Sequence, residues 1–128
     1  MQKIAIIQIS EAGSEIAATL KRELKATVIQ RSEVGKEWKK QDAFIFIGAM
    51  GICVRTIAPF VNDKHEDPAV VCVDSLGTNA ISVLSGHIGG ANDLTKEISA
   101  IPYPLLSVGS LWLSVPFAAL RQFHCLPH

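Results

Sequence analysis

The chain has 128 residues, 48% of them hydrophobic and 19% charged, with 12 basic and 12 acidic side chains and a pI near 6.9. This length and composition predict about one domain with a sizeable core, and they exclude a disordered chain. The balanced charge lacks the basic surplus of a nucleic-acid-binding protein, so no nucleic-acid partner is expected.

The three cysteines, Cys53, Cys72 and Cys125, are an odd number without close spacing. Such a set argues against a disulfide framework and against a zinc site. Cys53 and Cys72 stand in apolar runs, where a free cysteine acts as a small buried hydrophobe. The chain opens on a strand-like pattern without a signal peptide, so we expect a cytoplasmic protein.

The first half of the chain alternates between strand and helix patterns. Residues 4–9 form a nearly continuous apolar run, which is typical of a strand buried on both faces of a parallel sheet. Ile16 and Leu20 recur at helical spacing and predict a helix that Ser10 or Ser14 caps. Four further segments follow, namely a short strand over 27–30, a polar connection over 32–41, a buried strand over 43–47, and a helix over 52–58 that stops at Pro59.

The second half predicts a hairpin and a final helix. Strands over 69–73 and 80–84 flank a turn at 74–78, an arrangement typical of a hairpin connection. Residues 91–98 predict a helix after a glycine-rich loop. This order of elements predicts an α/β fold, a three-layer Rossmann-like sandwich with a mainly parallel sheet and a hairpin near residues 69–84.

The composition changes after residue 98. Four of the six prolines lie there, and Arg121 is the only fully charged side chain. The apolar stretch 105–120 is shorter than the roughly 18–20 residues that span a bilayer, and Pro116 interrupts it, so no membrane contact is expected. We predict a domain over residues 1–100 and an atypical apolar tail over 101–128, either packed on the domain or foreign to it.

One loop concentrates the residues best suited to chemistry, and it holds Ser85, His87 and the glycines Gly86, Gly89 and Gly90. His87 is the candidate general base, because an imidazole titrates near neutrality. The alternative is that His87 bonds to the backbone and fixes the loop. The glycines, with the amides that open the next helix, form either an anion cradle or a tight turn that needs positive φ.

Two further polar residues belong to this loop and the start of the next helix. Ser85 is a candidate oxyanion donor or helix cap, and it is not a nucleophile because the G-x-S-x-G elbow is absent. Asn92 is a candidate ligand contact, although Asn92 and Asp93 at a helix start more often cap the helix.

Gly48 and Gly51 form a second strand-to-helix junction, and Arg55 follows it. For these two glycines the alternatives are again an anion cradle or a tight turn. The planar guanidinium of Arg55 suits a carboxylate of a ligand, and the alternative is a surface salt bridge. Ligands of open α/β sheets gather at the carboxyl ends of the strands. If the strands before the two glycine loops are parallel neighbours, both loops flank one cleft, which is our main structural prediction.

Three blocks of the sequence, residues 46–59, 67–74 and 82–94, resemble conserved blocks of the CbiG family of cobalamin biosynthesis in order and spacing. The resemblance covers about residues 3–98, the N-terminal domain of that family. It implies an enzyme of the anaerobic corrin pathway that hydrolyses the ring-A δ-lactone of cobalt-precorrin-5A and releases acetaldehyde to give cobalt-precorrin-5B. The implied substrate is a cobalt-bearing tetrapyrrole, and because it carries the cobalt, no cofactor and no protein metal site are implied.

The resemblance also bears on the site and the partners. It favours His87 as the catalytic residue over a structural one. The candidate substrate contacts, which come from the loop residues themselves, are Gly48, Gly51, Arg55, Ser85, Gly86, Gly89, Gly90 and Asn92. The family continues into a second α/β domain, so we expect a truncated N-terminal fragment. The expected partner is that C-terminal domain, another corrin-pathway enzyme, or a second copy in a homodimer.

Two other functions compete with a hydrolase domain. One is a non-catalytic tetrapyrrole-binding or domain-docking module. The other is a nucleotide-binding Rossmann-like domain. The turn at residues 10–13 argues against this function, because it lacks the full G-x-G-x-x-G fingerprint.

Overall fold

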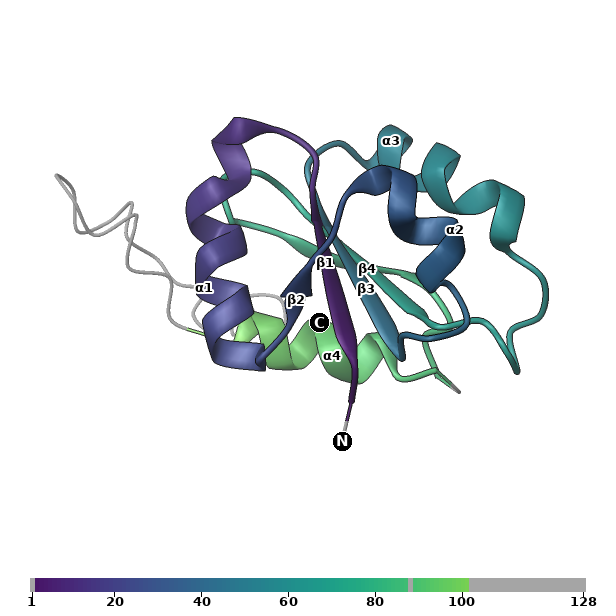
Figure 1. Ribbon diagram of the computed structural model, residues 1–128. Helices are drawn as coiled ribbons and strands as arrows, with labels where there is room; N and C mark the ends of the chain where they lie inside the picture. Colours follow the sequence, from purple (N-terminus) through teal and green to yellow (C-terminus); the bar gives the residue numbers. More distant parts are fainter. Residues whose placement is uncertain (1, 88, 102–128) are drawn as a thin grey trace, which may run out of the picture.

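A five-stranded sheet forms the middle layer of the computed structural model, which describes residues 2–87 and 89–101 (Figure 1). Its strands are β1 (Ile4–Gln8), β2 (Thr27–Val28), β3 (Ala43–Ile47), β4 (Ala69–Val73) and β5 (Ala80–Leu84). They lie in the order β2-β1-β3-β4-β5, and the first four are parallel. β5 pairs antiparallel with β4. The predicted parallel sheet and its hairpin are confirmed.

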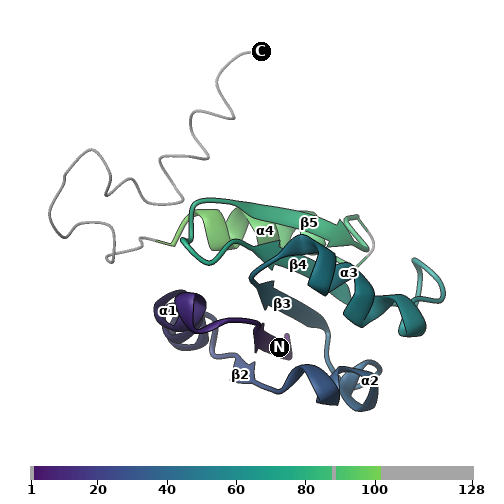
Figure 2. The ribbon, with the colours of Figure 1, turned by 90° about the horizontal axis from the view of Figure 1, so that it is seen from above.

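Helices cover both faces of the sheet and complete three layers (Figure 2). One face carries α1 (Ser14–Leu24) and α4 (Ala91–Ser99), and the other carries α2 (Val34–Glu37) and α3 (Met50–Ile57). Three short 3-10 turns adjoin the helices: η1 (Glu11–Gly13), η2 (Arg31–Glu33) and η3 (Ala58–Phe60). The predicted three-layer α/β architecture is therefore confirmed.

The core is divided between the two faces of the sheet by alternation along the strands. Ile4 and Ile6 belong to the apolar cluster beneath α1 and α4, whereas Ala5 and Ile7 belong to the cluster beneath α2 and α3. Every residue of β3 and β4 is buried. Burial on both faces explains why continuous apolar runs, rather than alternating ones, mark these strands in the sequence.

Two local predictions are wrong. The predicted polar connection over 32–41 contains α2, because Val34 and Trp38 are buried against the sheet while the polar residues around them face outward. The predicted serine cap of α1 is absent, since η1 intervenes after β1 and the N-cap of α1 is Gly13, without a side-chain hydrogen bond.

The predictions for the tail lie outside the described residues, apart from Ile101. That residue is buried and belongs to the cluster beneath α1 and α4. No helix within residues 2–87 and 89–101 has the length and apolar character needed to cross a bilayer. The division of the chain near residue 100 stays a prediction.

Asp74 holds the turn of the β4–β5 hairpin. Its Oδ1 accepts the backbone N–H of Thr78 at 2.8 Å, and its Oδ2 accepts the Thr78 hydroxyl at 2.5 Å and the Asn79 amide at 3.1 Å. Partial burial works against ionisation, but the hydrogen bonds from Thr78, Asn79 and Gly77 outweigh it and hold the pKa of Asp74 below its ordinary value. The predicted turn at 74–78 is therefore held by the side chain of Asp74.

We expect Asp74→Asn to lower the free energy of unfolding at pH 7 by about 1 kcal/mol, because a half-exposed carboxylate loses charge-assisted hydrogen bonds. A lowered folded-state pKa gives stability that is present above the ordinary carboxyl pKa and is lost as the pH falls through the folded value. Urea unfolding at pH 7 and at pH 3 should therefore show a smaller acid loss for Asp74→Asn than for wild type. Glu97→Gln, on the exposed surface of α4, is the matched control and should keep the wild-type pH dependence.

Candidate functional site

The two glycine-rich loops lie at opposite edges of the sheet. Gly48 follows the carboxyl end of β3, level with the carboxyl end of β4. β5 runs the other way, and Leu84 at its carboxyl end pairs with Val70 near the start of β4. The loop of residues 85–90, here called the histidine loop, therefore lies where β1, β3 and β4 begin. The prediction that both loops flank one cleft is wrong, because the preceding strands are not parallel neighbours.

Backbone hydrogen bonds close the histidine loop. The N–H of Ala91 donates to the carbonyl of Ser85 at 3.1 Å, and the N–H of Asn92 donates to the carbonyl of Gly86 at 3.0 Å. Ser85 has φ +58 and Gly90, the N-cap of α4, has φ +87. Glycine adopts this left-handed conformation without strain. Since the two amides at the start of α4 already donate within the loop, the geometry supports the tight-turn interpretation over the anion cradle.

Close packing accounts for the other two glycines of the loop. A Cβ on Gly89 would stand 2.5 Å from the Cβ of Ser85, and a Cβ on Gly86 would stand 2.8 Å from Oδ1 of Asn92. The Asn92 amide thus lies against Gly86, and α4 has no side-chain cap. The expectation that Asn92 or Asp93 caps this helix is wrong, because Gly90 occupies the N-cap position.

His87 is exposed and makes no hydrogen bond with another described residue. Together with Lys64, Ser85 and Gly86 it lines a small pocket of about 260 Å³. An imidazole that no described residue engages can take a proton from water, and a lysine ammonium in the same pocket can stabilise developing negative charge. The pocket therefore brings together a base and a cation that the sequence separates by two strands, β4 and β5, and the loops around them.

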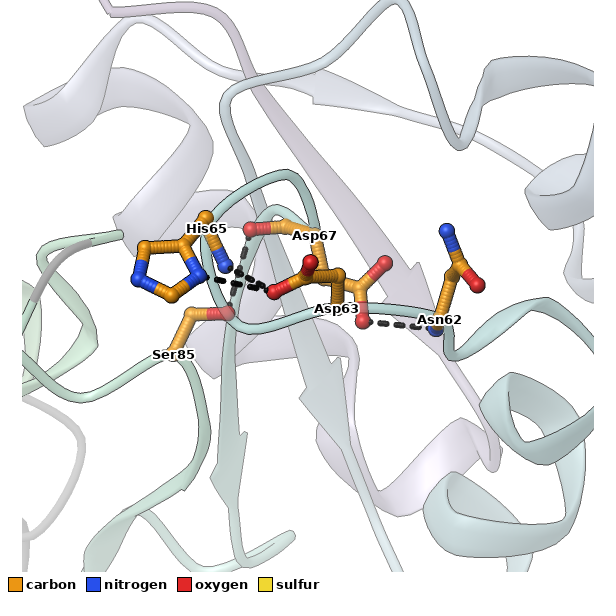
Figure 3. A network of polar contacts seen from close by, with 5 residues as sticks. All are labelled: Asn62, Asp63, His65, Asp67 and Ser85. Atoms are coloured by element: carbon orange, nitrogen blue, oxygen red, sulfur yellow. Dashed lines mark hydrogen bonds and ion pairs between the residues drawn. The ribbon is translucent and has the colours of Figure 1, made fainter.

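Asp67 anchors this edge of the sheet (Figure 3). Its residue surface is 6% exposed. Oδ1 accepts the indole N–H of Trp38 at 3.3 Å, and Oδ2 accepts the backbone N–H of Asn62 at 2.8 Å. Its backbone carbonyl accepts the hydroxyl of Ser85 at 3.1 Å. One residue therefore ties together α2, the loop before β4 and the histidine loop.

The contact with Asp67 decides the role of Ser85. The only hydroxyl hydrogen of Ser85 points to a backbone carbonyl, and the residue is buried. The geometry therefore gives Ser85 the task of holding the histidine loop and does not support the oxyanion-donor interpretation. Sequence reasoning gave Asp67 no role. An aspartate directly before Pro68 and a buried strand was the one signal that could have drawn attention to it.

Asp63 and His65 form a second polar contact in the loop before β4 (Figure 3). The backbone N–H of His65 and its ring Nδ1 each lie 2.9 Å from Oδ1 of Asp63. These hydrogen bonds hold the pKa of Asp63 below its ordinary value. Both side chains are largely exposed. His65 is therefore an exposed histidine whose ring is held by Asp63.

A larger cavity of about 540 Å³ opens at the same edge of the sheet. Trp38, Lys39, Asn62 and Asp67 are among its lining residues, and Gly89 brings the histidine loop to its wall. The edge where β1, β3 and β4 begin therefore carries two hollows beside the histidine loop. This is the best candidate for a functional site near His87.

The Gly48 junction at the opposite edge is explained first by packing. Gly48 has φ +143, and a Cβ there would stand 2.8 Å from the Cβ of Ile9. Gly51 is an exposed residue in the first turn of α3, and a Cβ on it would stand 3.4 Å from Nη1 of Arg55. Arg55 is exposed and forms no ion pair with the described residues. The structure thus brings Gly51 and Arg55 together, away from His87.

Cys53 and Cys72 lie in the apolar cluster beneath α2 and α3, as expected for buried hydrophobes. The Cys72 thiol donates to the carbonyl of Gly48 at 3.5 Å. A hydrogen bond between the two thiols, together with burial, raises the pKa of Cys53. Within residues 2–87 and 89–101, no group of three or more His, Cys, Asp or Glu side chains is placed to hold a metal ion.

Comparison with known proteins relates the chain to a single family. Residues 32–102 match the family model described as Cobalamin synthesis G N-terminal. A cobalt-precorrin-5A hydrolase from Salmonella typhimurium is 59% identical over 59 residues, which are 46% of this chain and 17% of that protein. A cobalt-precorrin-5A hydrolase from Priestia megaterium is 36% identical over 130 aligned positions, which cover 83% of this chain and 35% of that protein.

A solved structure agrees with these matches. The crystal structure of a cobalamin biosynthesis protein G homolog from Sulfolobus solfataricus superposes with a TM-score of 0.68 at 35% identity and covers 77% of this chain and 34% of that one. The chain thus spans about a third or less of the length of these relatives. The matched residues 32–102 take in both glycine loops, Arg55, Asp67 and His87. Since they make up more than half of the sequence, the chain belongs to the family of cobalamin synthesis G N-terminal domains.

Proposed function

We propose that this domain is the N-terminal part of a cobalt-precorrin-5A hydrolase in the anaerobic route to cobalamin. The whole protein would hydrolyse the ring-A δ-lactone of cobalt-precorrin-5A and release acetaldehyde, giving cobalt-precorrin-5B. Relatives that bear this name support the proposal. Within the domain, the observation that carries it is that His87, which has no hydrogen bond with a described residue, lines one pocket with Lys64. The cobalt enters with the substrate, so the proposal needs no cofactor of the protein's own.

The first step adds one water molecule across the lactone. His87 takes a proton from the attacking water, and Lys64 stabilises the negative charge that develops on the carbonyl oxygen. The ring C–O bond then breaks, and the proton on His87 passes to the departing oxygen. The products of this step are a carboxylic acid, which loses its proton to solvent and becomes a carboxylate, and a free hydroxyl group, and His87 is again neutral.

The second step is a retro-aldol cleavage that releases acetaldehyde. A base removes the proton from the freed hydroxyl, the adjacent C–C bond breaks, and its electron pair moves into the conjugated macrocycle. The macrocycle is the electron sink, so the protein has to hold the ring and move one proton. His87, returned to its neutral form by the first step, is the base that we assign.

A domain-docking module is the second candidate, and exposed apolar side chains favour it. Val54 of α3, Ile81 of β5 and Leu76 in the hairpin turn are exposed apolar side chains. Exposed apolar side chains around an edge strand are a common feature of docking surfaces. In this alternative the domain positions a catalytic partner and His87 has no chemical role.

Acetaldehyde release from cobalt-precorrin-5A tests the proposed function. The full-length protein and the 128-residue chain are compared in an assay that couples acetaldehyde to oxidation of NADH by alcohol dehydrogenase. We expect release from the full-length protein, and binding of the macrocycle without release from the chain alone. A full-length protein that binds the macrocycle and releases no acetaldehyde would contradict the hydrolase assignment.

A further inference from the structure

A groove of about 800 Å³ lies between two helical segments on one face of the sheet. One wall comes from η2 and α2 and the other from α3 and η3. The groove is separate from the pocket that holds His87. Its lining residues include Arg31, Gly35, Ile52, Arg55, Thr56 and Phe60.

The groove is positively charged and holds no balancing acid. Arg31 and Arg55 both line it, and none of the described residues along it is an aspartate or a glutamate. Neither arginine forms an ion pair with the described part of the chain. Glu33, the acid on the same turn as Arg31, accepts the backbone N–H of Gln30 at 2.8 Å and so completes a capping box. Two guanidinium groups with no internal counter-charge are the complement of an anion with more than one acidic group.

The lining also contains the apolar side chains of Ile52, Pro59 and Phe60, and Phe60 supplies a flat ring. Phe60 is 37% exposed, and its ring lies so close over Gly35 that a Cβ there would stand 2.6 Å from Cζ. The ring is also supported from behind by Trp38, at 6.0 Å between ring centroids. Phe60 lines both this groove and the 540 Å³ cavity at the edge that carries the histidine loop. The absence of a side chain at Gly35 thus gives the Phe60 ring room to pack against α2, and the exposed part of the ring lies in the groove.

We propose that this groove binds a polycarboxylate with a flat apolar body, whose carboxylates pair with Arg31 and Arg55 and whose ring lies against Phe60. Each guanidinium can bind a carboxylate through two parallel N–H···O bonds. The two arginines therefore favour carboxylates by their orientation as well as by their charge. In naming the macrocycle as the natural ligand, the proposal rests on the proposed function. The chemistry of the groove stands on its lining residues alone.

Titration with a porphyrin tests the proposal on the whole 128-residue chain. The probe is tetra(carboxyphenyl)porphyrin, and binding is followed by the shift of its Soret absorbance. We expect Arg31→Gln and Arg55→Gln each to weaken binding by about tenfold or more, because each removes a charge-assisted contact. Arg22→Gln is the matched control, since Arg22 is an exposed arginine on α1 at the opposite face of the sheet, and it should bind as wild type does. Unchanged thermal melting of all three variants confirms that they are folded.

Two further probes separate the charge from the ring. Tetra(N-methylpyridyl)porphyrin has the same ring with cationic groups and should not bind. Poly-glutamate carries carboxylates without a ring and should compete only weakly. The proposal is overturned if the carboxylate porphyrin fails to bind, if the arginine variants bind it as well as wild type, or if poly-glutamate competes as well as the porphyrin. Because acetaldehyde release is not measured here, a protein without hydrolase activity can still pass this test, and an active one can fail it.

Discussion

Replacing His87 with alanine in the full-length protein is expected to lower kcat for acetaldehyde release by about a hundredfold or more, the usual contribution of a general base. The side chain is exposed and has no hydrogen bond with a described residue, so its loss leaves no buried group unpaired. The melting temperature of the variant should therefore match that of wild type. Steady-state kinetics on cobalt-precorrin-5A and a thermal melt give the two measurements.

His65→Ala is the matched control for this experiment. His65 is also an exposed histidine at the same edge of the sheet, but its ring is held by Asp63 and it does not line the His87 pocket. We expect it to retain wild-type kcat. If His87→Ala remains fully active, or if both variants lose activity equally, His87 is not the base, and the docking alternative gains support.

The strands of the sheet could be predicted from the sequence because a strand that is buried on both faces forms a continuous apolar run. β1, β3 and β4 all follow this rule, and the turn between β4 and β5 follows from its polar residues. α2 could not be predicted from a pattern of this kind. It is one turn long, and Val34 and Trp38 are the two buried positions within a mostly charged segment, so the helical spacing rests on a single pair.

The predicted hairpin of residues 69–84 is correct, and it is incompatible with the predicted single cleft between the two glycine loops. An antiparallel hairpin places the end of its second strand beside the start of its first. Residues 69–84 form such a hairpin, so the loop that follows has to lie at the edge opposite to Gly48. The general rule that ligands gather at carboxyl strand ends applies to parallel strands and does not extend to a loop that follows β5.

The contacts of the site itself could not be derived from the sequence. Trp38 and Asp67 are 29 positions apart, and Asp67 and Ser85 are 18 apart. Such pairs depend on how α2 and the hairpin are placed relative to one another, which no local pattern encodes. The sequence did identify the glycine loop and His87 as special, because conformationally permissive residues around a histidine are a local feature.

Replacing Asp67 with alanine is expected to lower the free energy of unfolding by about 3 kcal/mol, because one buried and one partly buried donor lose their acceptor at once. Those donors are the indole N–H of Trp38 and the backbone N–H of Asn62. Asp63→Ala is the matched control, since Asp63 is a nearby aspartate whose side chain is largely exposed. Urea unfolding of the two variants should show a much smaller loss for Asp63→Ala.

A double-mutant cycle with Trp38→Phe assigns the loss to the contact. Phenylalanine keeps most of the ring that stacks on Phe44 at 5.3 Å between centroids, but it removes the indole donor. In the Trp38→Phe background, Asp67→Ala should therefore cost about 1 kcal/mol less than in wild type, which is the coupling expected for one such hydrogen bond. If the cost is the same in both backgrounds, the hydrogen bond contributes nothing to stability. The burial of Asp67 would then have to be explained by its contact with Asn62 and by the cavity that it lines.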